Sequence, residues 1–179
     1  PLYVSIAILI KLDSPGPILF QQDRLGLHGK KFKIWKFRTM VTDAEKLQAA
    51  LEAKNEIKDG VLFKLKDDPR ITNVGKFLRH YSLDELPQLF NIVLGEMSLV
   101  GPRPLPLRDV ERFKTTHFIR QEVLPGITGL WQVSGRSDID NFEDGVKLDI
   151  TYIENWSIWL DLRILFKTVG VVFNKTGAY

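Results

Sequence analysis

The stretch from Tyr81 to Pro104, YSLDELPQLFNIVLGEMSLVGPRP, restricts the fold more than any other part of the chain. Two adjacent acids stand near its start, an apolar run follows, and Gly101-Pro102-Arg103-Pro104 closes it. Because proline is tolerated in the first turn of a helix, Pro87 allows a helix that starts at the acids and ends at Gly95. We expect the buried face of this helix to consist of Leu86, Leu89, Phe90, Val93 and Leu94.

The two acids, Asp84 and Glu85, have two interpretations. Ser82 and Glu85 have the spacing of a capping box, in which both acids only complete a helix start. Alternatively, one carboxylate attacks a phosphate and the other holds a divalent ion, with guanidinium groups binding the phosphate oxygens. Four arginines lie in turns or at helix ends, where they could serve that purpose: Arg70, Arg79, Arg103 and Arg136.

Composition limits the class of protein. With 179 residues, 44% hydrophobic and 26% charged, the chain suits one domain with a core and is neither disordered nor a polytopic membrane protein. The absence of cysteine excludes disulfides and thiolate metal sites. A net charge of +3 fits an anionic partner. We expect no nucleic acid, because the acid pair would repel its backbone, and no metal at the scattered His28, His80 and His117.

A β-hairpin is predicted where apolar and polar residues alternate, in Ile18–Arg24 and Lys31–Arg38, with Leu27–Lys30 as the turn. Lys36 and Arg38 fall on one face of the second strand and could point together at an anion. The alternative is a solvated basic edge strand.

The remaining patterns predict a mixed α+β domain. Helical patterns cover residues 42–59, 74–81, 107–121, 142–154 and 156–173, and short strands are expected at 61–66 and 130–133. In the second helix, Val74, Phe77 and Leu78 form the apolar stripe, which directs Arg79 toward the following turn. The last helix carries tryptophans at one end, which suits either a membrane interface or a helix that closes the core.

The first segment, Pro1–Leu12, is almost wholly apolar. Because the chain starts without methionine, we expect it to be part of a longer protein. As a helix the segment would be about 18 Å long, too short for a hydrocarbon core of roughly 30 Å. It is either a buried first helix or strand, or a cut membrane segment.

Four long motifs, in this order, resemble one family: SPGPILFQQDRLGLHGKKFKIWKFRTM, DPRIT, VGKFLRHYSLDELPQLFNIVLGEMSLVGPRP and LPGITGLWQVSGR. They are similar to the bacterial sugar transferases that are monotopic phosphoglycosyl transferases. The likeness extends from Pro1 to about Phe173. Size and ending resemble the catalytic domain of the larger polyprenyl glycosylphosphotransferases.

The resemblance implies a reaction and a place in the cell. Such enzymes transfer a sugar-1-phosphate from a UDP-sugar to undecaprenyl phosphate and release UMP, as the first membrane step of exopolysaccharide, O-antigen or capsule synthesis. They work at the cytoplasmic face of the bacterial inner membrane. Residues 1–12 would be the second half of a re-entrant membrane helix, residues 13–179 the catalytic domain, and amphipathic helices would lie at the lipid interface. A homodimer is allowed, and the sugar is left open.

The resemblance also implies roles for individual residues. Asp84 would be the nucleophile that forms a phosphosugar intermediate, and Glu85, with Asp84, would hold Mg²⁺. The phosphates would be bound by Lys36, Arg79, Arg103 and Arg136. In a second enzymatic reading, Asp84 or Glu85 acts as general base for direct attack by the lipid phosphate. A third reading is a non-catalytic peripheral membrane-binding module, in which the acid pair is only a helix cap.

Overall fold

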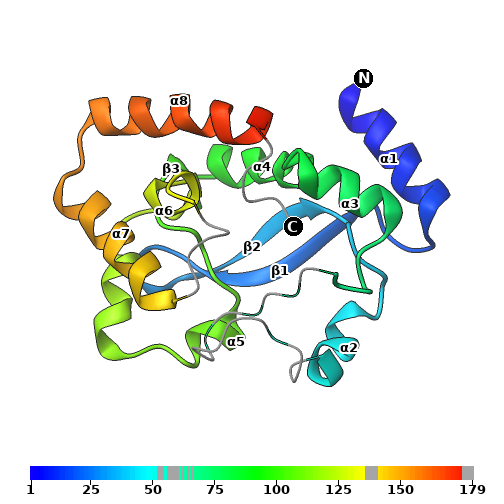
Figure 1. Ribbon diagram of the computed structural model, residues 1–179, viewed down its shortest axis with the longest axis horizontal. Coiled ribbons are helices and arrows are strands. Elements are labelled where there is room, and N and C mark those ends of the chain that lie inside the picture. Colours follow the sequence, from blue (N-terminus) through cyan, green and yellow to red (C-terminus); the bar gives the residue numbers. More distant parts are fainter. Residues whose placement is uncertain are drawn as a thin grey trace.

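A β-hairpin runs through the middle of the molecule (Figure 1). The computed structural model describes residues 1–51, 67–135 and 141–174, together with residues 55, 61, 63 and 65. Strands β1 (Leu19–Leu25) and β2 (Lys31–Phe37) pair antiparallel, with the short 3₁₀ turn η1 (Leu27–Gly29) between them. The hairpin predicted from the alternating pattern is therefore confirmed.

Helices cover the hairpin from two sides. On one side lie α1 (Leu2–Asp13), α3 (Asn73–His80), α4 (Gln88–Val93) and α8 (Ile158–Asn174), and on the other α2 (Ala44–Leu51) and α5 (Leu107–Val110) (Figure 1). The remaining helices are α6 (Leu130–Val133) and α7 (Phe142–Glu154). The predicted mixed α+β class is confirmed. Among the described helices, none has both the length and the apolar character needed to cross a membrane.

β2 is enclosed on both faces only in its second half. Phe32 and Ile34 pack with Met97 on one face. Phe37, on the other face, packs with Ile6 and other residues of α1 and α3. The solvated edge strand holds only for the start of β2, where Lys31 and Lys33 are exposed.

Arg38 and Lys36 do not act together. The guanidinium of Arg38 donates hydrogen bonds to the carbonyl oxygen of Pro17 and to Ser14, so it closes the turn after α1. Lys36 points instead into the interior, toward the acid pair. The predicted contact of Lys36 and Arg38 with a shared anion is wrong, because the guanidinium of Arg38 is already bonded to the turn after α1.

A second sheet consists of two short parallel strands, β3 (Ser98–Val100) and β4 (Gly126–Thr128). A Cβ atom at Gly126 would stand 2.1 Å from the backbone nitrogen of Gly101, so glycine permits this close pairing. The strand predicted at Leu130–Val133 is wrong: these residues form α6.

The helix predicted over residues 107–121 is also wrong, because it is broken in two. After α5 the chain turns and continues as the 3₁₀ helix η4 (Thr115–Gln121). The imidazole Nδ1 of the buried His117 accepts a hydrogen bond from the backbone N–H of Lys114, at 3.1 Å. A side chain that bonds locally to the backbone competes with a continuous helix.

Three predicted helices are observed at nearly their expected positions: α7 has the predicted bounds, and each end of α3 and α8 differs by one or two residues. The first segment, for which a helix or a strand was left open, forms the helix α1. The start of the predicted helix 42–59 is α2, whereas most of its second half and of the predicted strand 61–66 lie outside the described residues. The division at residue 12 and the re-entrant membrane helix stay predictions.

Candidate active site

The buried and exposed faces of α4 are the reverse of those predicted. Its polar residues are buried: Asn91 is 0% exposed and bonds through its amide to the backbone of β2, at Lys33 and Trp35. Most of its apolar residues point outward, and Val93 is 85% exposed, whereas Ile92 packs against the cluster of Phe32, Ile34 and Met97. The predicted apolar buried face is therefore wrong for Leu89, Phe90, Val93 and Leu94.

The acid pair precedes α4 in the short 3₁₀ helix η3 (Leu83–Glu85). Ser82 adopts a left-handed conformation with φ of 53°, and its side chain makes no capping hydrogen bond. The predicted capping box is therefore wrong, because the chain leaves α3 through a tight turn at Ser82. The carboxylates are turned toward the hairpin.

Glu85 is the centre of a three-residue ion cluster. Its Oε1 atom accepts hydrogen bonds from Lys36 Nζ and from Arg103 Nη2, both at 2.7 Å. The three side chains are 15–18% exposed. They come from β2, from η3 and from the Gly-Pro-Arg-Pro segment after β3, so elements distant in sequence meet at one oxygen.

Asp84 is buried beside this cluster and is less well paired. Within the part of the chain that the structure describes, no hydrogen bond reaches its carboxylate. Burial raises the pKa of Asp84, and the charge of Glu85 adds to this effect, while Lys36 and two arginines oppose it. A carboxylate that is poorly hydrogen-bonded, near several cations, has a lone pair free for attack on a phosphorus atom.

The two cations that hold Glu85 respond differently to burial. Burial lowers the pKa of Lys36 to about 8, although Glu85 opposes the shift. Burial also disfavours the charge of Arg103, but the charge and hydrogen bond of Glu85 outweigh it and raise the pKa. Arg103 is therefore a fixed positive charge at the site.

Arg79 reaches the same region from the end of α3. Its Nε atom donates to Thr39 Oγ1 at 2.9 Å, and its charge acts on Asp84. Three of the four predicted phosphate-binding residues are thus gathered around the acid pair. The fourth, Arg136, lies outside the described residues.

Comparison with known protein families identifies the group to which this chain belongs. The model of the family described as bacterial sugar transferase matches residues 1–175. The chain belongs to the bacterial sugar transferase family.

Three similar proteins illustrate the relationship. The chain is 49% identical to galactosyl transferase CpsE of Streptococcus agalactiae, over 91% of this chain and 36% of that protein. It is 46% identical to undecaprenyl-phosphate galactose phosphotransferase of Salmonella typhimurium, over 100% of this chain and 38% of the relative. It is 42% identical to UDP-glucose:undecaprenyl-phosphate glucose-1-phosphate transferase of Klebsiella pneumoniae, over 100% and 37%. The chain therefore spans little more than a third of the length of these curated relatives.

In this bacterial sugar transferase, three further charged residues lie near Arg103 that no sequence motif indicated: Arg24, Arg120 and Asp149. Arg24 donates to the carbonyl oxygen of Pro104 at 3.1 Å. Arg120 donates to the carbonyl oxygen of Arg103 at 2.9 Å and pairs with Asp149. Strand alternation could have placed Arg24 on the inner face of the hairpin, since it is an even number of residues from Gln22 and Phe20, which opposes Lys36. Arg120 and Asp149 lie in no sequence motif or periodic pattern that would have indicated their contact with this segment.

Asp84 and Glu85 suit a magnesium ion that is shared with a phosphate substrate. Among the described residues, no group of three or more acids or histidines is placed to hold a metal ion on its own. Mg²⁺ typically uses one or two carboxylates, keeps several waters and completes its shell with substrate phosphates. The donor set at the acid pair fits that pattern.

Proposed function

We propose that this bacterial sugar transferase transfers a sugar-1-phosphate from a UDP-sugar to undecaprenyl phosphate and releases UMP. One observation carries the proposal: a buried, poorly paired Asp84 lies beside Glu85, which two cations hold. The names of the relatives support this substrate pair. These names include both galactose and glucose transferases, so the proposal does not specify the sugar.

The proposed reaction has two displacements at the same phosphorus. In the first, an oxygen of Asp84 attacks the β-phosphorus, and the bond to the bridging oxygen breaks, so that UMP leaves. In the second, an oxygen of undecaprenyl phosphate attacks the acyl phosphate, and Asp84 leaves as a carboxylate. Lys36, Arg79 and Arg103 would neutralise the phosphate oxygens as charge moves between them.

Magnesium would be held by Glu85 and Asp84. When bound, the ion would supply charge neutralisation on the diphosphate, which phosphoryl transfer requires. Lys36 and Arg103 already meet at Glu85 Oε1, so the cations lie where a diphosphate would arrive beside the acids.

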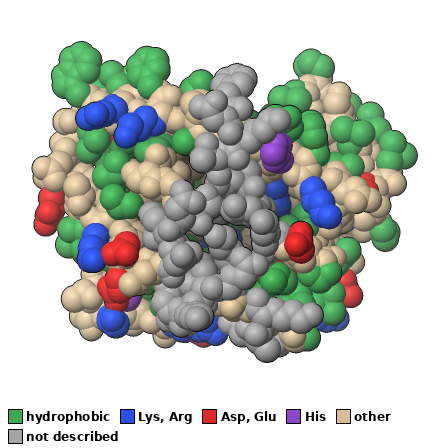
Figure 2. Space-filling model, viewed as in Figure 1, with side chains coloured by type: hydrophobic (Ala, Val, Ile, Leu, Met, Phe, Trp, Pro, Cys, Tyr) green, Lys and Arg blue, Asp and Glu red, His purple; other side chains and the backbone are tan. Residues whose placement is uncertain are grey.

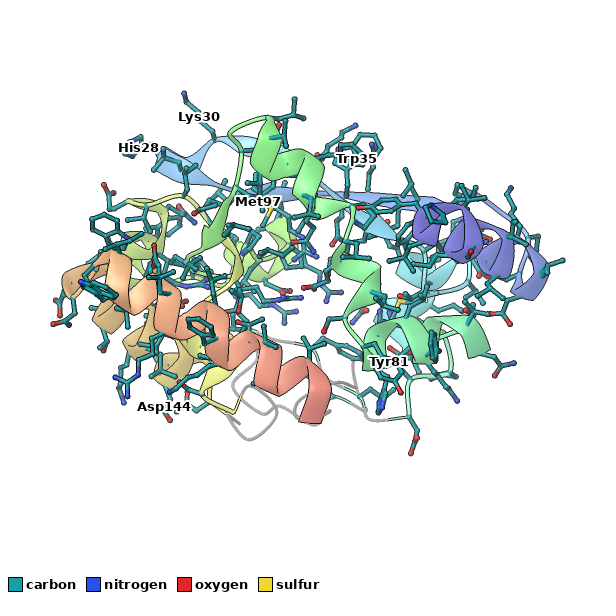
Figure 3. The ribbon with its side chains drawn as sticks, turned by 90° about the horizontal axis from the view of Figure 1, so that it is seen from above. His28, Lys30, Trp35, Tyr81, Met97 and Asp144 are labelled. Atoms are coloured by element: carbon teal, nitrogen blue, oxygen red, sulfur yellow. The ribbon has the colours of Figure 1, made fainter. Side chains whose placement is uncertain are left out.

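We further propose that the outward face of α1, α4 and α8 lies in a lipid surface, at the cytoplasmic face of the bacterial inner membrane. These helices lie along one side of the molecule (Figures 1 and 3). In Figure 2 apolar side chains gather over α8 and over α1. This apolar face comprises Leu2, Val4, Ile8, Leu12, Phe90, Val93, Leu94, Trp156, Trp159 and Phe166, all more than half exposed.

The inversion of α4 favours lipid as the occupant of this face. A helix with amides inward and apolar residues outward is unfavourable in water. Tryptophan at the start of α8 suits the level of the lipid headgroups. An acceptor that is itself lipid-linked would be delivered at the same surface.

The direct test is incubation of the protein with a panel of UDP-hexoses and Mg²⁺. We expect UMP release and, without acceptor, a mass increment on Asp84 equal to a phosphosugar. Asp84→Asn should reduce UMP release by more than about a thousandfold, as loss of a catalytic nucleophile does in other enzymes. Full activity of this variant would disprove the nucleophile.

A matched control is Asp144→Asn. Asp144 is an exposed acid on α7 that contacts Lys147, and it lies well apart from Tyr81 in Figure 3. This variant should release UMP at the wild-type rate. UMP release that requires the lipid acceptor, with no adduct on Asp84, would favour direct attack by the lipid phosphate instead.

A further inference from the structure

The backbone of Arg103 is held by a hydrogen bond from a side chain outside its own segment. Arg103 stands between Pro102 and Pro104, and neither proline has an N–H to donate to a neighbouring strand. The carbonyl oxygens of Arg103 and Pro104 instead accept hydrogen bonds from buried guanidinium groups of Arg120 and Arg24, at 2.9 and 3.1 Å. Backbone pairing extends as far as Pro102, whose carbonyl oxygen accepts a hydrogen bond from the N–H of Gly126, and side chains hold the backbone at Arg103 and Pro104.

Arg120 is itself held on every side. Its Nε atom donates to Asp149 Oδ2 at 2.6 Å, while Nη2 donates to the Arg103 carbonyl. The guanidinium carbon lies 5.5–5.9 Å from the ring centroids of Phe113, Trp131 and Phe142. A planar fork can serve a carboxylate and a carbonyl at once, which a lysine ammonium cannot do in the same geometry.

We propose that Arg120, oriented by Asp149, is a positioning residue that fixes Arg103 for the substrate phosphates. The contacts form an unbroken series: Asp149 to Arg120, Arg120 to the backbone of Arg103, and the side chain of Arg103 to Glu85 Oε1 at 2.7 Å. The role of the substrate phosphates in this inference rests on the proposed function.

A purely structural role explains the pair less well. Replacing a buried ion pair by packed apolar residues is often neutral or stabilising. Burial raises the pKa of Asp149 although Arg120 opposes this, so the ionised pair is maintained at a cost. η4 and α7 are also joined elsewhere, because Lys114 and His117 both contact Glu143.

The test compares Arg120→Lys with Glu143→Gln. Arg120→Lys keeps the positive charge beside Asp149 but loses the second donor, so Arg103 is no longer held. We expect the Kd for UMP and the KM for the UDP-sugar to rise about tenfold, which is about 1.4 kcal/mol, with a smaller change in kcat. Glu143→Gln weakens the other contact between η4 and α7 and should leave Kd and KM unchanged.

A double-mutant cycle separates positioning from folding. In an Arg103→Ala background, Arg120→Lys should not weaken UMP binding further, because the residue it positions is gone. Asp149→Asn should reproduce the loss seen with Arg120→Lys. Thermal unfolding of each variant verifies that binding is measured on folded protein.

Two results would overturn the proposal: wild-type UMP affinity in Arg120→Lys, or an equal loss of affinity with and without Arg103. A wild-type protein that binds neither UMP nor inorganic pyrophosphate would also overturn it. If UMP binds but no UDP-sugar is turned over, the proposed function fails, whereas the cycle still decides the positioning role.

Discussion

Asp84 and Glu85 are neighbours in the chain, yet their surroundings differ. Glu85 is held by two cations, whereas no described residue donates a hydrogen bond to Asp84. Because burial raises the pKa of Asp84, its charge is unfavourable in the folded protein. This difference supports the proposal that Asp84 is the nucleophile, while Glu85 organises Lys36 and Arg103.

We predict opposite stability effects for the two amide variants. Glu85→Gln leaves Lys36 and Arg103 buried without their carboxylate and should lower the free energy of unfolding by about 1–3 kcal/mol. Asp84→Asn removes an unfavourable buried charge and should leave stability unchanged or higher. Urea denaturation at neutral pH measures both, and a large loss for Asp84→Asn would contradict this account.

A second residue-scale prediction concerns Asp68, which pairs with Arg70 in the Asp-Pro-Arg turn. Burial disfavours the charge of Asp68, but the hydrogen bonds and charge of Arg70 outweigh it and lower the pKa. The ionised pair therefore stabilises the fold above the unfolded-state pKa of about 3.9, and this stability is lost as pH falls through the lower folded pKa.

Asp68→Asn should accordingly cost about 1–3 kcal/mol near neutral pH. The difference from wild type should shrink as the pH falls below about 4. Denaturation curves over a series of pH values give this difference directly. A difference that stays constant down to the lowest pH at which the protein folds would contradict the assignment.

At the scale of elements, α4 shows that the environment decides which face of a helix is inside. Gln88 and Asn91 are buried, and Asn91 bonds to the backbone of β2, while most of the apolar residues face outward. In a lipid surface the outward apolar residues would also be removed from water. The acid pair lies just before this helix, in η3, so α4 connects the candidate site to the outward apolar face.

We predict that the double variant Val93→Gln, Leu94→Gln folds normally but binds membranes poorly. Both side chains are largely exposed, so the free energy of unfolding should change by less than about 0.5 kcal/mol per site. Each apolar side chain contributes about 1.5–3 kcal/mol when fully buried. Partition into vesicles of anionic lipid should therefore fall by at least about tenfold.

The matched control for α4 is Leu47→Gln. Leu47 is also an exposed leucine, but it lies on α2, on the opposite side of the hairpin (Figure 1). Vesicle flotation should not distinguish this variant from wild type. Equal losses for the two variants would show that general hydrophobicity, and not the face of α1, α4 and α8, governs binding.

At the scale of the whole molecule, the acid pair lies between the hairpin and the apolar face. A water-soluble sugar nucleotide and a lipid-linked acceptor would have to meet at the same aspartate. In the proposed function, membrane contact would depend on apolar side chains, whereas the chemistry would depend on charged residues and a metal ion. The two properties should be separable by experiment.

We predict that chelation of divalent ions abolishes UMP release and leaves membrane binding intact. Excess EDTA would remove the ion proposed at Glu85 and Asp84, so the diphosphate charge would be poorly neutralised. UMP release should return when Mg²⁺ is added in excess. Turnover that persists in EDTA would remove the metal from the proposal, while loss of flotation in EDTA would contradict the separation.

Local patterns in the sequence predicted much of this protein. Alternation predicts the hairpin, a period of 3.6 residues predicts α7 and α8, and the adjacent acids Asp84 and Glu85 indicate the candidate site. These signals suffice because each depends on residues a few positions apart. The family motifs added the roles of the cations, which spacing alone left open.

Only the tertiary structure decided the rest. It placed the polar face of α4 inside, because Asn91 bonds to the backbone of β2, which lies fifty-six or more residues away in the chain. It also brought Arg120, paired with Asp149, to the backbone of Arg103. Long-range hydrogen bonds and buried charges determined these features, and such contacts leave no periodic trace in a single sequence.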